Sequence, residues 1–207
     1  MTRTMDLVVL VPGSDEREAL DELLSRRRQS LGIREISYRF VKHPQRDPGC
    51  FHGGPQLLQP YQNRSEHALI VLDHEGSGQE RRTAEEVTAD LSRRLRASGW
   101  DDRAEVLVIE PELEIWIWSD SPEVDRALRW KKGGLRQWMA ERQLWPEGKL
   151  KPQRPKESLE AALRQVSVRR SAAIYRQLAG AVGLERCTDS SFERFKTILR
   201  SWFGESS

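Results

Sequence analysis

The chain has 207 residues, of which 37% are apolar and 32% charged, and its 34 basic and 32 acidic residues leave a net charge of +2. This length suits one domain with or without an extension, and a charge so close to neutral excludes a uniformly basic nucleic-acid-binding protein. Seven tryptophans argue against disorder. Cys50 and Cys187 lack the spacing of metal ligands, and no apolar run is long enough to span a membrane. We therefore expect a cytoplasmic protein without a zinc site, a disulfide framework or a membrane association.

Four segments of the N-terminal part have the pattern of β-strands. Residues 6–11, 67–72 and 104–109 are apolar and rich in β-branched side chains, as in parallel strands that are covered on both faces. Residues 35–41 alternate between apolar and polar side chains. That alternation predicts a strand with one exposed face, near an edge of the sheet.

The segments between these strands predict an α/β fold. Residues 15–30 and 80–98 carry aliphatic side chains at helical spacing, so each predicts an amphipathic helix. Residues 42–65 hold four prolines and three glycines and predict a loop with room for one short helix. Strands that alternate with helices indicate a mostly parallel four-stranded sheet with helices on both faces.

The character of the chain changes after Trp118. No strand pattern follows, and helices are predicted at 122–130, 133–143, 156–166, 171–183 and 189–203. We therefore expect an α/β core over 1–118 and a helical C-terminal extension over 119–207 that packs on it. Five tryptophans are the expected apolar anchors of this extension: Trp116, Trp118, Trp130, Trp138 and Trp145.

Acidic residues follow each of the predicted central strands. The carboxyl ends of parallel strands meet at one edge of a sheet, where open α/β folds bind their ligands. Asp73 and Glu75 follow the second apolar run, alternate along the chain, and are next to Gly76 and Gly78. Two such carboxylates on one side of a strand end favour a hard cation, Mg²⁺ or Mn²⁺, with oxygen ligands. Further ligands are expected from the next strand end, at Glu112 and Glu114.

These acids also have structural interpretations. Asp15 and Glu16 come just before a predicted helix, so capping of that helix is as well supported as a functional role. Exposed or structural roles fit Glu112 and Glu114 equally well. For His74, which alternates with Asp73 and Glu75, we favour a supporting role over catalysis.

Basic clusters are the candidates for contact with nucleic-acid phosphates. The arginine triplets and pairs within the predicted helices are better explained as solvent-exposed helix faces. The cluster around 149–156 lies between prolines in a loop, so phosphate binding and simple exposure are equally well supported there. The candidates are Arg81, Arg82, Lys131, Lys132, Lys149, Lys151, Arg154 and Lys156.

Together these motifs resemble the Toprim-like domain of small bacterial proteins related to the DUF4276 group. The resemblance is carried by an acidic group after the first strand, by Asp73-His-Glu-Gly76, and by Glu112-Leu-Glu-Ile-Trp116. The runs 151–157 and 187–195 also resemble that group. The segments 71–78 and 151–157 are similar, more narrowly, to a small protein of methylation-associated anti-phage defence operons.

The resemblance implies a Mg²⁺-dependent nuclease of a bacterial anti-phage defence system, acting on nucleic-acid phosphodiesters with other operon proteins as partners. Glu16, Asp73 and Glu75 are then the catalytic candidates, with Asp73, Glu75, Glu112 and Glu114 as metal ligands. One departure weakens this assignment: Toprim enzymes carry a glutamate directly at the end of the first strand, where this chain has Val11-Pro-Gly13. A non-catalytic interaction subunit that keeps the Toprim-like fold is therefore the alternative, and the pattern carries no signal for an oligomeric state.

Overall fold

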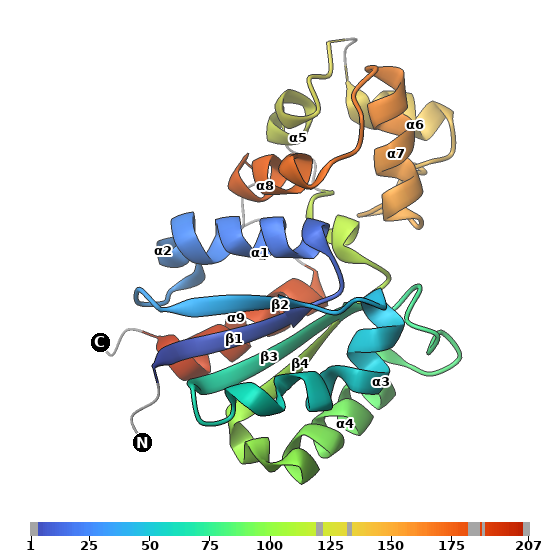
Figure 1. Ribbon diagram of the computed structural model, residues 1–207. Helices are drawn as coiled ribbons and strands as arrows, with labels where there is room; N and C mark the ends of the chain where they lie inside the picture. Colours follow the sequence, from blue (N-terminus) through green and yellow to red (C-terminus); the bar gives the residue numbers. More distant parts are fainter. Residues whose placement is uncertain (1–3, 119–121, 132–133, 182–186, 188, 205–207) are drawn as a thin grey trace.

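The computed structural model describes residues 4–118, 122–131, 134–181, 187 and 189–204. Its centre is one four-stranded sheet of parallel strands in the order β2-β1-β3-β4 (Figure 1). The predicted α/β class and parallel sheet are thus confirmed, and β2 lies at an edge as its alternating pattern indicated. The strands are β1 (Met5–Val11), β2 (Tyr38–Lys42), β3 (Ser65–Asp73) and β4 (Ala104–Ile109).

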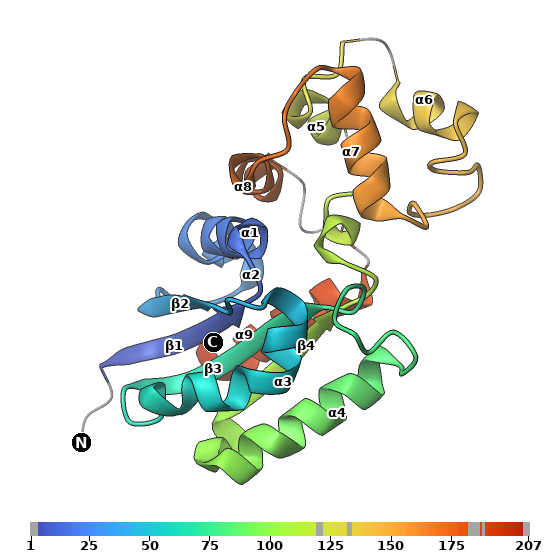
Figure 2. The ribbon, with the colours of Figure 1, turned by 45° about the vertical axis from the view of Figure 1, so that its right-hand side comes forward.

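Alternate side chains of the central strands enter two separate cores. On one face, Val9 and Val11 pack with α1 (Ser14–Arg26) and α9 (Ser190–Phe203). On the other face, Val8 and Leu10 pack with α3 (Arg46–Leu58) and α4 (Ala84–Leu95). Helices therefore cover both faces, as Figure 2 shows from the side of α3 and α4. The short elements are α2 (Arg28–Leu31), 3₁₀ turns at Gln59–Tyr61, Asp101–Arg103 and Leu113–Trp116, and a π turn at Arg96–Trp100.

The helix expected within the segment 42–65 is present but longer than predicted, because α3 occupies thirteen of these residues and leaves little of it as loop. Its glycines are contact points rather than breaks: a Cβ at Gly54 would lie 2.9 Å from Ile70 of β3, so only glycine lets the helix approach the sheet this closely. Pro48 falls in the first turn of α3, where a backbone N–H has no partner within the helix. The close approach brings the N-terminus of α3 to the carboxyl edge of the sheet.

Every described element after Trp118 is helical, apart from one isolated bridge between Ile33 and Gly204. α9 packs against β4 and covers the sheet, whereas α8 (Ala172–Ala181) packs against the outer side of α1, away from the sheet (Figures 1 and 2). Of the predicted anchors, Trp116, Trp118, Trp130 and Trp145 are buried and Trp138 is half-buried. The remaining helices are α5 (Pro122–Ala127), α6 (Leu135–Glu141) and α7 (Pro155–Gln165).

No helix in the described ranges combines the length and the apolar composition that crossing a membrane requires.

Candidate functional site

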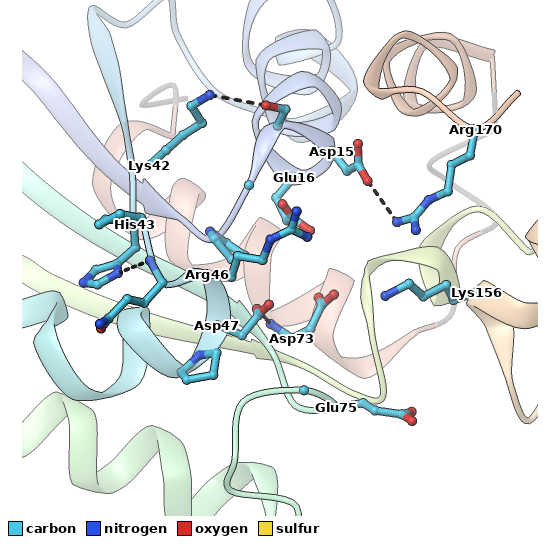
Figure 3. Close-up of a pocket in the computed structure, with 17 residues that line it drawn as sticks. Asp15, Glu16, Lys42, His43, Arg46, Asp47, Asp73, Glu75, Lys156 and Arg170 are labelled. Atoms are coloured by element: carbon cyan, nitrogen blue, oxygen red, sulfur yellow. Dashed lines mark hydrogen bonds and ion pairs between the residues drawn. The ribbon is translucent and has the colours of Figure 1, made fainter.

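An open pocket of about 800 Å³ lies at the carboxyl ends of β1, β2 and β3 (Figure 3). Its lining comes from the turn after β1, the connection from β2 to α3, the end of β3 and two cationic residues of the C-terminal part, Lys156 and Arg170. The carboxyl edge of the strands is where open α/β folds bind ligands. This pocket is therefore the candidate functional site.

Glu16, Asp47 and Asp73 lie together in this pocket, and we refer to them as the acidic floor (Figure 3). Two of them are oriented by the backbone: the Asp73 amide donates to Asp47 Oδ1 over 2.8 Å, and the Leu113 amide donates to Asp73 Oδ1 over 3.0 Å. Both bonds use the Oδ1 atom, so Oδ2 of Asp47 and Oδ2 of Asp73 take no part in them. Among the described residues no cation forms an ion pair with the acidic floor, whereas the neighbouring Asp15 pairs with Arg170.

Burial raises the pKa of each floor carboxyl, and for Glu16 and Asp73 the charges of neighbouring carboxylates add to it. Loss of solvent is the largest cause for Glu16, and the charges of Asp47 and Asp15 add to it, so that its pKa rises to about 7. Burial also raises the pKa of Asp47. For Asp73, which is 7% exposed, burial and then the charge of Glu16 move the pKa well above its usual range. Carboxyls whose pKa is raised in a pocket mark a candidate site for acid–base or metal chemistry.

Glu16 reaches the floor from the first turn of α1 rather than from the end of β1. Its carboxylate folds back over Gly13, where a Cβ would lie 2.9 Å from Glu16 Oε2. Gly13 is the N-cap of α1 and has no side chain to cap it. The chain thus brings a glutamate to the pocket although none stands directly at the strand end.

Glu75 is not part of the acidic floor. β3 ends at Asp73, so the strand alternation that was expected to bring both side chains to one side stops before Glu75. Glu75 lies in a turn, where its amide donates to Pro111 O over 2.9 Å and its exposed side chain points away from Asp73 at the pocket rim (Figure 3). His74, between them, contacts Arg82 O through Nε2 at 2.9 Å and holds the base of this turn, which fits the supporting role we favoured.

Glu112 and Glu114 are turned toward the C-terminal helices. Glu112 accepts a 2.9 Å hydrogen bond from the amide of Lys156 in the first turn of α7, and its second oxygen lies 3.8 Å from Lys156 Nζ. Glu114 is 2% exposed and accepts hydrogen bonds from Tyr175 Oη and, over 3.3 Å, from Arg170. Both carboxylates therefore hold helices, while their charges also act on Asp73, and their role as metal ligands stays a prediction.

The tryptophans of the same segment continue this pattern. Trp116 donates to Ser191 Oγ of α9 over 2.7 Å, and Trp118 donates to the Pro155 carbonyl of α7 over 2.8 Å. The Glu-x-Glu-x-Trp motif is thus the segment on which α7, α8 and α9 are fastened.

Of the predicted phosphate-binding residues, Lys156 alone lines the pocket. Arg82 pairs with Asp90 and lies over the Phe51 ring, and Arg81 is exposed next to it. Lys151 donates to the Ile115 carbonyl over 2.5 Å, so it is a structural contact. Arg154 is exposed beside Glu157, Lys131 and Lys149 lie away from the pocket lining, and Lys132 lies outside the described residues.

Three cations of the pocket and one floor carboxylate were missed by the sequence analysis. Lys42, Arg46 and Arg170 line the pocket beside Lys156, and Asp47 completes the floor (Figure 3). Asp47 and Arg46 follow β2, which neighbours β1 at the edge of the sheet, so the rule of strand carboxyl ends would have found them had it been applied to this strand as well as to the central ones. Arg170 is some 155 residues from its partner Asp15 in the chain, and no local pattern signals such a pair.

The donor types of the floor fit Mg²⁺ or Mn²⁺, which prefer carboxylate oxygens. In the described ranges no three His, Cys, Asp or Glu side chains are arranged to hold one ion together. Mg²⁺ usually keeps several waters and takes one or two carboxylates with phosphate oxygens. Asp47 and Asp73, each with one oxygen outside its backbone bond, meet that smaller requirement.

Comparison of the chain with protein-family models, curated proteins and solved structures gives no match. The resemblance to Toprim-like proteins therefore stays a prediction, and the pocket itself is the basis for assigning a function.

Proposed function

We propose that the pocket is a Mg²⁺- or Mn²⁺-dependent site for phosphodiester cleavage in nucleic acids, with Asp47 and Asp73 as the metal-binding residues and Glu16 as general acid or base. A role in an anti-phage defence system, which the motif resemblance implies, is part of the same proposal.

One observation carries the proposal: three carboxylates that form no ion pair among the described residues share the pocket with four cations. These carboxylates repel one another, and that repulsion contributes to the raised pKa values of Glu16 and Asp73. A divalent cation relieves that repulsion, and a negatively charged phosphate group can pair with the lysine and arginine side chains that line the pocket. A metal and a phosphate together therefore complement the charges of the pocket better than either does alone.

The residues divide the chemistry between them. A divalent ion bound at Asp47 and Asp73 would neutralise charge on the phosphate and lower the pKa of a coordinated water. Glu16, with a pKa of about 7, is present in both protonation states near neutral pH. It is therefore suited to accept a proton from an attacking water or to donate one to the leaving oxygen.

A non-catalytic interaction subunit is the second candidate. It is favoured by the absence of a glutamate directly after β1, where Val11-Pro-Gly13 stands, and by Glu112 and Glu114, whose carboxylates are engaged with the C-terminal helices. In this case the acidic floor binds no ion, and the protein copurifies with operon partners whether or not the floor is intact.

Calorimetric titration with Mg²⁺ and Mn²⁺ separates the two candidates. Asp73→Asn is the informative variant, because an asparagine oxygen can still accept the Leu113 amide and preserve the fold. Asp102→Asn is the matched control, since Asp102 is exposed just before β4, at the opposite end of the strands.

We expect wild type and Asp102→Asn to bind the ion and to cleave single-stranded DNA, duplex DNA or RNA, and Asp73→Asn to lose both properties. Equal cleavage by Asp73→Asn would exclude the acidic floor as the active site. If wild type binds no ion and cleaves none of these substrates, the interaction subunit becomes the better assignment.

A further inference from the structure

Arg46 is the pocket cation whose guanidinium makes no close contact with another described side chain, although its charge attracts the nearby Asp47 carboxylate. Its guanidinium extends over the pocket (Figure 3), and in the described part of the chain it forms no ion pair or side-chain hydrogen bond. Arg170 is the contrast: its guanidinium contacts Asp15, Glu114, Glu160 and Tyr175. Arg170 is therefore committed to the fold, whereas the donors of Arg46 are open to a ligand.

The backbone at Arg46 is held in an unfavourable conformation. Its φ of 53° lies in the left-handed region, where residues with side chains are uncommon and glycine is usual. A turn that served only to start α3 would be made more easily by glycine. Strained positions of this kind cluster at functional sites, and here the strained residue is the one whose side chain enters the pocket.

The turn that carries Arg46 is firmly fixed. The Arg46 amide donates to the His43 carbonyl over 3.1 Å, and the Gln45 amide donates to His43 Nδ1 over 3.1 Å. The His43 ring lies against Gly49 of α3, where a Cβ would fall 1.9 Å from Nδ1. The base of the Arg46 side chain is thus in place before any ligand binds, which lowers the entropic cost of binding.

Two further positive features surround Arg46. It is the first residue of α3, whose thirteen residues begin at the pocket with amides that have no partner within the helix. Lys156 lines the other side of the pocket, and its side chain is 42% exposed. Its ion pair with Glu112 is a long one, with 3.8 Å between Lys156 Nζ and Glu112 Oε2. An anion between Arg46 and Lys156 would lie directly over the acidic floor.

We propose that Arg46, together with Lys156, binds one backbone phosphate of a nucleic-acid strand and positions it against the acidic floor. The planar guanidinium suits two parallel hydrogen bonds to phosphate oxygens. The inference rests on the proposed function for its substrate class, but it concerns the phosphate and not the metal. It assigns the main strand contact to the β2–α3 turn, and of the basic residues predicted at Arg81, Arg82 and 149–156 it keeps Lys156.

The test measures binding of a short fluorescein-labelled oligothymidylate by anisotropy at several salt concentrations, with Ca²⁺ in place of Mg²⁺ to suppress cleavage. Arg46→Gln should weaken binding by about tenfold to a hundredfold, the usual effect of losing a charged hydrogen bond. The slope of log K against log salt concentration should be less steep by about 0.7 in this variant, because one phosphate contact to a single strand contributes about that much. Arg46→Lys should restore this slope but only part of the affinity, because it keeps the charge and loses the paired geometry.

Arg26→Gln is the matched control, since it removes the same charge from the exposed far end of α1, and it should bind as wild type does. Wild-type affinity in Arg46→Gln, or a wild type that does not bind the oligonucleotide, would overturn the inference.

Calorimetry with Mg²⁺ on the same proteins keeps the two proposals apart. If Asp73→Asn abolishes Mg²⁺ binding but Arg46→Gln binds the oligonucleotide as wild type does, the phosphate contact is refuted and the metal site is supported. Oligonucleotide binding that depends on Arg46 in a protein that takes up no Mg²⁺ would support the contact and refute the metal chemistry.

Discussion

Glu16→Gln should make the metal-free protein more stable at neutral pH, by an amount that depends on pH. The pKa of Glu16 is raised by burial and by its acidic neighbours from 4.5 to about 7. A carboxyl with a raised folded-state pKa stabilises the fold below its unfolded pKa and loses that contribution as the pH rises through the folded value. Wild type should therefore lose stability between about pH 4.5 and 7 relative to the variant.

The size of the effect follows from the same interval. A shift from 4.5 to about 7, at about 1.4 kcal/mol per pKa unit, amounts to about 3 kcal/mol. Other carboxyls have their pKa lowered, such as that of Asp6, which hydrogen bonds from Arg34 and Ser37 stabilise in its charged form against the opposing effect of burial. They titrate equally in both proteins and cancel in the difference. At pH 4 the two proteins should have nearly equal free energies of unfolding.

Urea denaturation followed by tryptophan fluorescence, in EDTA and over a pH series, measures this difference. A stability difference that stays constant from pH 4 to 8 would show that Glu16 titrates normally and does not face the other acids. Repeating the series with Mg²⁺ adds a second check, because an ion bound to the floor should remove most of the disadvantage of wild type.

Three further substitutions probe neighbouring parts of the site. Arg46→Gly should stabilise the fold by about 1 kcal/mol in urea denaturation, since glycine relieves the left-handed strain; a loss of stability would mean that the arginine side chain supports the fold. Gly13→Ala should push away the Glu16 carboxylate, which lies 2.9 Å from the new Cβ position, and flatten the pH dependence as Glu16→Gln does; an unchanged profile would contradict the folded-back position. Tyr175→Phe should cost about 1–3 kcal/mol of unfolding free energy, because the buried Glu114 loses a hydrogen bond; a neutral effect would show that Arg170 alone satisfies Glu114.

The sheet was predictable because its signal is local. Buried parallel strands are continuous apolar runs, and β1, β3 and β4 each occupy one. The carboxyl-end rule then led from these runs to Glu16 and Asp73, which the structure brings into one pocket. The rule worked because it needs only the position of each strand end and the parallel direction of the strands.

The connection from β2 to α3 was mispredicted because glycine and proline were taken only as helix breakers. In α3 the glycines permit close packing on the sheet and on His43, and Pro48 occupies a position where no amide is needed. Arg46 and Asp47, the two residues that most change the view of the site, were missed as well, because the strand-end rule was applied only to the central strands. Glycine at helix–sheet contacts depends on the distance between elements, which a local pattern does not contain.

Glu112 and Glu114 have the sequence pattern of metal ligands, but in the structure they make structural contacts. These contacts explain how the pocket is built. Glu112 holds the first turn of α7, which carries Lys156, and Glu114 holds Arg170 and α8. These are the two cations that the C-terminal part contributes to the pocket. The acidic motif therefore acts on the site indirectly: by fastening the helices to the sheet edge, it supplies positive charge opposite the acidic floor.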